Sequence, residues 1–206
     1  MKKNFFFTTA LILLAHIATA QLELKPAIGM TVAKFDSDPV FELNNDSLVT
    51  NGKVGYQFGA SLAIGRKLFA EPGIFYTRLA QDMQPTIADK EDFTYSAGYM
   101  RIPVNFGFQF IGSPNSLAGL RIFLGPSLMF PLSIKENDYP VEKDNVTSPQ
   151  FDIFAGAGLN IWFLFLDVSY GWGLTPQYIN DPIEAKMQSL YANIGFRFKL
   201  KSEEEY

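Results

Sequence analysis

From residue 21 onward, the chain alternates large apolar side chains with small or polar ones at almost every second position. The stretch 95–111 is the clearest, because Ile102, Val104 and Phe106 alternate with Pro103 and Asn105. A period of two predicts β-strands whose two faces meet different surroundings, and no helical period of useful length follows residue 20. Eight segments carry the pattern, near 22–35, 54–64, 68–79, 95–111, 119–134, 151–161, 164–175 and 188–200. Most have about the 9–11 residues that a tilted transmembrane strand needs.

The connections between these segments alternate in length. The long polar loops are 36–53, 80–94, 135–150 and 176–187, and the short turns are 65–67, 112–118 and 162–163. In an up-and-down barrel this order puts every long loop at one end and both chain termini at the other, as in outer-membrane barrels. At 162–163 the apolar residues switch from odd to even positions, which predicts a two-residue hairpin turn.

The two faces of the strands differ in size as well as polarity. One is bulky and aromatic, and the other consists mostly of Gly, Ala, Ser and Asn, in a chain with only 18% charged residues. A soluble barrel would instead expose a face rich in Lys and Glu. We therefore predict an all-β fold, an eight-stranded antiparallel up-and-down transmembrane β-barrel, which is closed because lipid leaves no backbone group unpaired. A soluble barrel or sandwich is the alternative. Side chains fill the interior of eight strands, which argues against an open aqueous pore.

Residues 1–20 have the three parts of a secretion signal. Lys2 and Lys3 form a basic start, an apolar stretch runs from Phe5 to Ile17, and Ala18-Thr19-Ala20 fits an A-x-A cleavage site. We expect cleavage before Gln21, which leaves residues 21–206 as the mature β-barrel domain. An exported transmembrane barrel of this layout is expected in the outer membrane of a Gram-negative bacterium. An uncleaved membrane anchor is the alternative, although the stretch is short for a spanning helix.

Cleavage at this position removes several kinds of chemistry. The chain has no Cys, and its single His is His16, inside the signal. The mature chain then cannot form Ser-His-Asp or Cys-His catalytic groups or His/Cys zinc sites. Asp36-Ser37-Asp38 is only a fragment of a calcium-binding loop. We therefore expect no enzyme activity, cofactor or metal, and the acidic net charge of −4 argues against a nucleic-acid partner.

A few charged side chains fall on the inward face. Unpaired charges in a closed lumen are costly, so we predict a structural charge network made of Glu71, Arg101, Arg121, Asp152, Asp167 and Arg197. Counting residues from each short turn places four of them near one level, and we expect an ion pair between Asp167 and Arg197 on neighbouring strands. A proton or ion path is the alternative role for these charges.

Several short motifs resemble a known family. They are Gly55-Tyr56-Gln57-Phe58-Gly59, Glu71-Pro72, Arg101-Ile102-Pro103-Val104, Leu124-Gly125-Pro126 and Gly171-Trp172-Gly173-Leu174. In this order, after an export signal, the chain is similar to the PorT-like eight-stranded outer-membrane barrels of the Bacteroidetes over roughly 22–200. The resemblance implies an outer-membrane location, and some of these relatives are linked to type IX secretion. Unlike many barrels, the chain continues past its last strand, with Lys201 to Tyr206.

Four functions are compatible with these features. The main hypothesis is a non-enzymatic structural or interaction barrel that meets membrane lipid, lipopolysaccharide or other envelope proteins through its long outer loops. The second is a narrow ion or small-solute channel. The third, a lipid-modifying barrel enzyme, is disfavoured by the loss of His16 with the signal. The fourth is an accessory of type IX secretion, and the residues themselves do not choose between the first and the fourth.

Overall fold

The computed structural model describes residues 21–36, 40–41, 46–85, 93–112, 116–135, 145–179 and 184–201. The predicted signal peptide lies outside the described residues, so its cleavage stays a prediction. Within the described ranges, no helix has the length and apolar character needed to cross a membrane.

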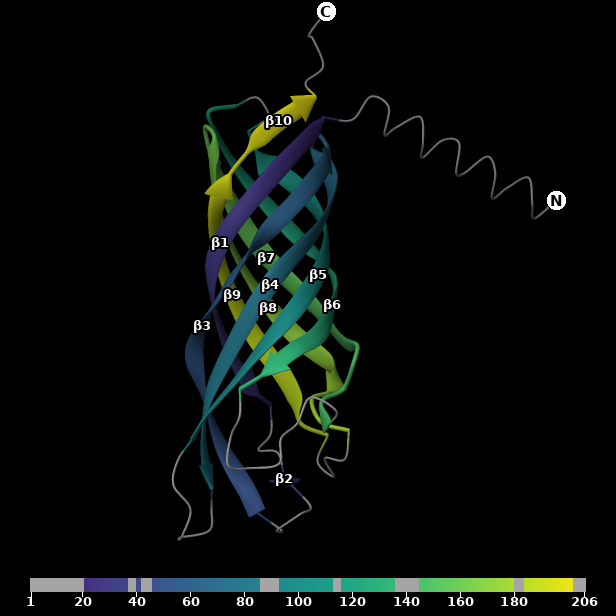
Figure 1. The fold of residues 1–206 in the computed structure, drawn as a ribbon. Coiled ribbons are helices and arrows are strands. Elements are labelled where there is room, and N and C mark those ends of the chain that lie inside the picture. Colours follow the sequence, from purple (N-terminus) through teal and green to yellow (C-terminus); the bar gives the residue numbers. More distant parts are fainter. Residues whose placement is uncertain are drawn as a thin grey trace, which may run out of the picture.

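The described chain folds almost entirely into strands, drawn as arrows in Figure 1. They are β1 (Leu22–Phe35), β2 (Val40–Phe41), β3 (Asp46–Gly65), β4 (Leu68–Pro85), β5 (Phe93–Ile111), β6 (Ala118–Ile134), β7 (Gln150–Ile161), β8 (Leu164–Pro176), β9 (Lys186–Phe196) and β10 (Phe198–Lys201). The eight predicted segments correspond to β1, β3 to β8, and β9 together with β10. The last strand is interrupted only at Arg197, whose amide donates to the Phe163 carbonyl oxygen at 2.7 Å.

Antiparallel pairing continues around the whole sheet and returns to its start. Consecutive strands pair from β3 to β9. The first strand, β1, pairs with β3 on one side and with β9 and β10 on the other, and this closes the sheet. The predicted closed, eight-stranded antiparallel barrel is confirmed. The start of β1 and the end of β10 lie at the same end of the barrel as the tight turns, at the top of Figure 1.

The tight turn at 162–163 also forms as predicted. Ile161 pairs with Leu164, so Trp162 and Phe163 alone connect β7 to β8. Trp162 has a φ of 53°, a left-handed conformation that bulky residues rarely adopt outside turns.

Three strands are longer than predicted. Because β3 begins at Asp46, β4 continues to Pro85 and β5 begins at Phe93, the loops expected at 36–53 and 80–94 are shorter. These extensions lie beyond the closed part of the barrel, since β1 pairs with β3 only as far as Val54. Thr94 and Lys53 donate hydrogen bonds to the Asp82 carboxylate at 2.7 and 2.9 Å and hold the pKa of that carboxyl below its ordinary value.

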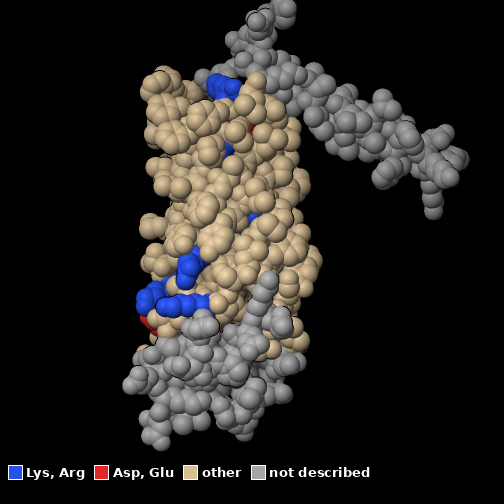
Figure 2. Space-filling view, in the orientation of Figure 1, with Lys and Arg blue, Asp and Glu red and all other residues tan. Residues whose placement is uncertain are grey.

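The two strand faces separate as the alternation predicts. On β6, Arg121, Phe123 and Met129 are buried, whereas Ile122 and Leu124 are 50% and 63% exposed. In Figure 2 the barrel wall is tan over most of its length, and the largest group of Lys and Arg lies toward its lower end. The small and polar face is therefore inside, and a broad apolar band covers the outside.

An apolar and aromatic cluster fills the lumen at the long-loop end. Its centre is Tyr99, which has no exposed surface and accepts a hydrogen bond from Gln177 Nε2 at 2.7 Å. Two loop residues join this cluster, because Val146 and Tyr178 form a β-bridge and are 2% and 3% exposed. Residues from both of these loops therefore belong to the core of the barrel.

We predict that arginine placed on the outer face destabilises the barrel according to its depth. Val168→Arg, midway along the outer face of β8, should lower the free energy of unfolding by about 2–4 kcal/mol, because it puts a charge at the centre of the lipid band. Leu174→Arg, on the same face near the long-loop end, should cost about 0–1 kcal/mol. Urea unfolding in lipid vesicles measures both. Equal and small effects would mean that this face does not meet lipid.

Candidate functional site

The centre of the lumen network is a buried lysine and glutamate. Lys25 on β1 and Glu71 on β4 are 1% and 2% exposed. The Lys25 ammonium donates to both carboxylate oxygens of Glu71, at 3.0 and 3.1 Å. The Ser61 hydroxyl, on β3 between them, donates to the same carboxylate at 2.7 Å. A buried charge needs such charged and hydrogen-bonding partners to remain ionised.

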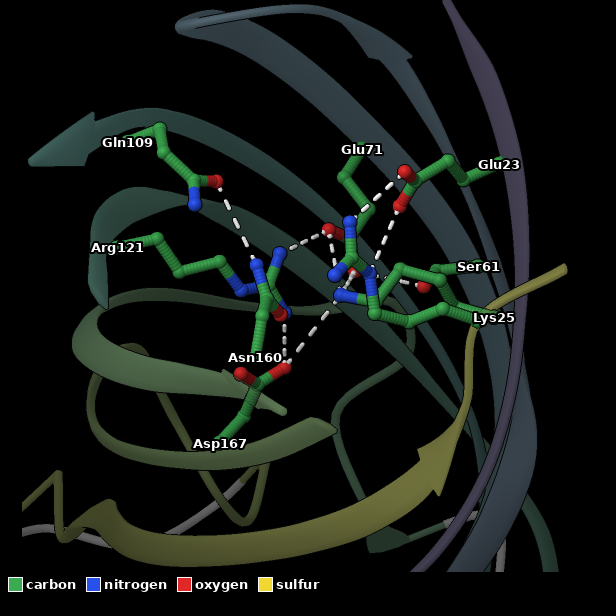
Figure 3. A network of polar contacts seen from close by, with 9 residues as sticks. Glu23, Lys25, Ser61, Glu71, Gln109, Arg121, Asn160 and Asp167 are labelled. Atoms are coloured by element: carbon green, nitrogen blue, oxygen red, sulfur yellow. Dashed lines mark hydrogen bonds and ion pairs between the residues drawn. The ribbon is translucent and has the colours of Figure 1, made fainter. Parts of the chain in front are cut away.

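Arg121 on β6 joins this pair to a second carboxylate. One terminal nitrogen of its guanidinium lies 2.5 Å from Glu71 Oε2, and the other donates to Asp167 Oδ2 on β8. Lys25 also lies 3.8 Å from Asp167. Figure 3 shows these side chains converging from opposite walls of the barrel. Two cations and two carboxylates thus form one cluster across the lumen.

A glycine makes room for this cluster. Arg121 and Asp167 lie on strands that are not neighbours, and Gly158 on β7 pairs with both of them. A Cβ at Gly158 would lie 2.0 Å from Asp167 Oδ1 and 2.9 Å from Arg121 Nε. The missing side chain therefore lets the arginine and the aspartate meet across the intervening strand.

Aromatic rings surround the charges. The Lys25 ammonium lies 4.1 Å from the centre of the Phe165 ring. The Arg121 guanidinium lies 5.4 to 5.7 Å from the rings of Phe69, Phe123 and Phe165. These distances are within the range of cation–π attraction. The rings also keep bulk water away from the ion pairs, which strengthens each electrostatic contact.

The predicted ion pair between Asp167 and Arg197 is wrong. Arg197 instead forms two hydrogen bonds with Glu23, from Nε to Oε2 at 3.0 Å and from Nη2 to Oε1 at 2.8 Å. The strand register explains the error, because Asp167 pairs with Asn193. Arg197 lies four residues farther on, beside the tight turn, where the start of β1 supplies Glu23.

The other two predicted residues lie apart from the cluster. Arg101 and Asp152 form no direct ion pair within the described part of the chain. The Arg101 guanidinium stacks on Tyr191 at 4.0 Å and lies 5.0 Å from the Phe154 ring. All six predicted residues are buried in the lumen, less than a tenth exposed, but they occupy three places instead of one.

Two members of the network were absent from the prediction. Glu23 and Lys25 both fall on the inward face of the first strand. Their place in the alternating pattern is the sequence signal from which their membership in the network can be predicted. With them included, the two ion-paired groups contain three cations and three carboxylates among the described residues, and the charges of these six residues cancel.

The space left beside the charges is small. A cavity of about 30 Å³ lies among Glu23, Lys25, Arg121, Asn160 and Arg197, enough for one or two water molecules. No group of three or more His, Cys, Asp or Glu residues suited to a metal ion occurs in the described ranges. Of the acidic loop fragment, only Asp36 is described, and its carboxylate accepts a hydrogen bond from the Lys186 amide at 2.8 Å.

Comparison with a known protein family agrees with the fold, and solved structures of other barrels are distantly similar. The sequence model of one family, described as an outer membrane protein beta-barrel domain, matches residues 18–178. The crystal structure of Ail, the attachment invasion locus protein of Yersinia pestis, in complex with the heparin analogue sucrose octasulfate, is 13% identical. That match covers 87% of this chain and 99% of that chain, with a TM-score of 0.46. A de novo designed transmembrane β-barrel is 14% identical over 86% of this chain and 95% of that chain, with a TM-score of 0.43. No curated protein matches the sequence.

We predict that Arg121→Met lowers the free energy of unfolding by about 3–5 kcal/mol, because within the described cluster it leaves two buried carboxylates to share the single charge of Lys25. The double variant Arg121→Met/Asp167→Asn restores neutrality and should recover most of this loss. Urea unfolding measures both. It is monitored by the heat-dependent gel shift, which is the change in gel mobility that a folded barrel shows when it is boiled. A double variant no more stable than the single one would contradict a charge-balanced network.

Gly158→Ala should also destabilise the barrel, by about 1–3 kcal/mol, because its Cβ displaces the Asp167 carboxylate from Arg121. Gly171→Ala is the matched control on the neighbouring strand, since the nearest atom to a Cβ there is Asp152 Oδ2 at 3.2 Å. The same unfolding measurement compares them, and equal losses would show that the space over Gly158 has no special role.

Proposed function

This chain belongs to the outer membrane protein β-barrel domain family, and from that membership we propose a non-enzymatic barrel that acts at the Gram-negative cell envelope through its surface and long loops. Its lumen has a structural role in this proposal. The long loops face the cell exterior and the tight turns face the periplasm, as is usual for barrels of this kind.

The single observation that carries the proposal is that side chains occupy the lumen at two levels. Toward the tight turns, Lys25, Glu71, Arg121 and Asp167 bridge the walls through ion pairs. Toward the long loops, the cluster around Tyr99 fills the same space. Within each ion pair the cation and the carboxylate neutralise one another, so little charge is left to attract a passing ion. This favours a structural role over a conducting one.

The partners that fit this role are membrane lipid, lipopolysaccharide and other envelope proteins. The PorT-like motifs favour one version of it, an accessory role in type IX secretion. Deletion of the gene in its native host tests that version through the secretion of cargo proteins. Normal secretion after deletion would remove the type IX role and leave the envelope role in place.

The lumen itself is tested by conductance in planar bilayers. We expect the purified protein, inserted and showing a heat-dependent gel shift, to give no stable current steps under conditions in which a general porin does. The charge network carries this expectation, because an ion would have to displace Lys25 or Arg121 from its carboxylates.

The channel alternative makes the opposite prediction. Reproducible unit steps whose size changes in the Arg121→Met variant, but not in Val168→Leu on the outer wall, would contradict the proposal and assign the charges to an ion path.

A further inference from the structure

The outer wall carries an apolar groove near the tight-turn end. It has a volume of about 880 Å³ and extends over strands β3 to β7. Volumes of roughly 300–1,000 Å³ are typical of sites for small ligands. Bulky side chains of Leu68, Phe106, Phe108 and Leu124 border the groove, and Leu68 is 76% exposed.

Small residues leave the room for this groove. Ala70 pairs with Phe106 across β4 and β5, and Ala155 pairs with Leu124 across β6 and β7. Phe106 and Leu124 therefore each have an alanine beside them, which leaves space next to their side chains. The depression is long, apolar and open toward the surroundings of the barrel, which suits a flexible hydrocarbon chain.

Two cations stand directly at the end of the groove. Gly65 and Leu68 both line it, and the two residues between them in the tight turn are Arg66 and Lys67. Both of these side chains are exposed. Arg66 also borders the small lumen cavity, so we expect a ligand outside the wall to meet Lys67 first. None of the residues that line the groove is acidic.

We infer that this groove binds an anionic phospholipid of the periplasmic leaflet, with an acyl chain in the groove and the headgroup phosphate at the 65–67 turn. The charge of the turn selects an acidic headgroup, because each cation near a membrane surface attracts anionic lipid. The tight-turn end selects the leaflet, and this step rests on the proposed orientation. A phospholipid is the occupant that joins an apolar chain to an anionic group at one membrane boundary.

Lipid retention tests the inference. The protein is reconstituted into vesicles of equal amounts of phosphatidylglycerol and phosphatidylcholine, extracted in mild detergent and weighed by native mass spectrometry. We expect the native chain to retain one lipid, predominantly phosphatidylglycerol. Ala155→Leu fills the groove and should remove retention of both lipids. Ala192→Leu, on the outer face of β9 and paired with Met30 and Val168 away from the groove, is the matched control and should retain lipid normally.

The headgroup contact is tested separately. Lys67→Gln should lower the preference for phosphatidylglycerol about fivefold, the factor expected for one cation at a membrane surface. Lys199→Gln removes a cation at the same end of the barrel, on β10 away from the groove, and should leave the preference unchanged.

If Ala155→Leu loses its heat-dependent gel shift, Ala70→Leu fills the other side of the groove in its place.

Three results would overturn the inference. They are a native chain that retains no lipid, equal retention in Ala155→Leu and Ala192→Leu, and a mass that corresponds to a second copy of the chain seated in the groove. Conductance measured on the same samples keeps the two proposals apart. Current steps with normal lipid retention would refute the closed lumen and leave the lipid site in place.

Discussion

The barrel depends on the seam at β1. In lipid, a strand edge would leave its amides and carbonyls without partners at a cost of several kcal/mol each, so every strand needs a neighbour on both sides. The first strand meets this requirement by pairing with β3 over eleven residues and with β9 and β10 on its other edge. Closure then sets a narrow interior, and the narrow interior requires that any charge inside it be matched by another.

The matching is achieved across the barrel rather than along neighbouring strands. Lys25 on β1 reaches Glu71 on β4, and Arg121 on β6 reaches both Glu71 and Asp167 on β8. Contacts over an intervening strand are possible where that strand offers a small residue, as Gly158 does between Arg121 and Asp167. The glycines of the inner face therefore help to decide which charges can meet, in addition to saving space.

Much of this architecture can be predicted from the two-residue period of the sequence and from whether odd or even positions carry the large apolar residues. The number of strands, the turn at 162–163 and the inward position of residues such as Glu71 and Arg121 follow from alternation, and the closed antiparallel order follows from the connection lengths and from the need to pair every backbone group in lipid. The pairing of charges does not, because depth in the barrel depends on the stagger between strands, which no local pattern records. Asp167 and Arg197 share a face on adjacent strands, yet Arg197 lies beside the turn and meets Glu23. Strand length was also underestimated, since polar residues such as Lys53 and Asp82 continue the ladder beyond the apolar band.

The aromatic cluster at the long-loop end has a consequence for how such a barrel can diversify. Val146 and Tyr178 belong to loops by position but to the core by burial. Their burial ties the bases of these two loops to the stability of the whole domain. Sequence change at these positions is therefore limited by the need to fold rather than by the need to bind a partner. A grafted epitope or an inherited insertion is therefore best accommodated beyond these anchors. The barrel thus separates the part of each of these loops that can evolve freely from the part that must stay constant.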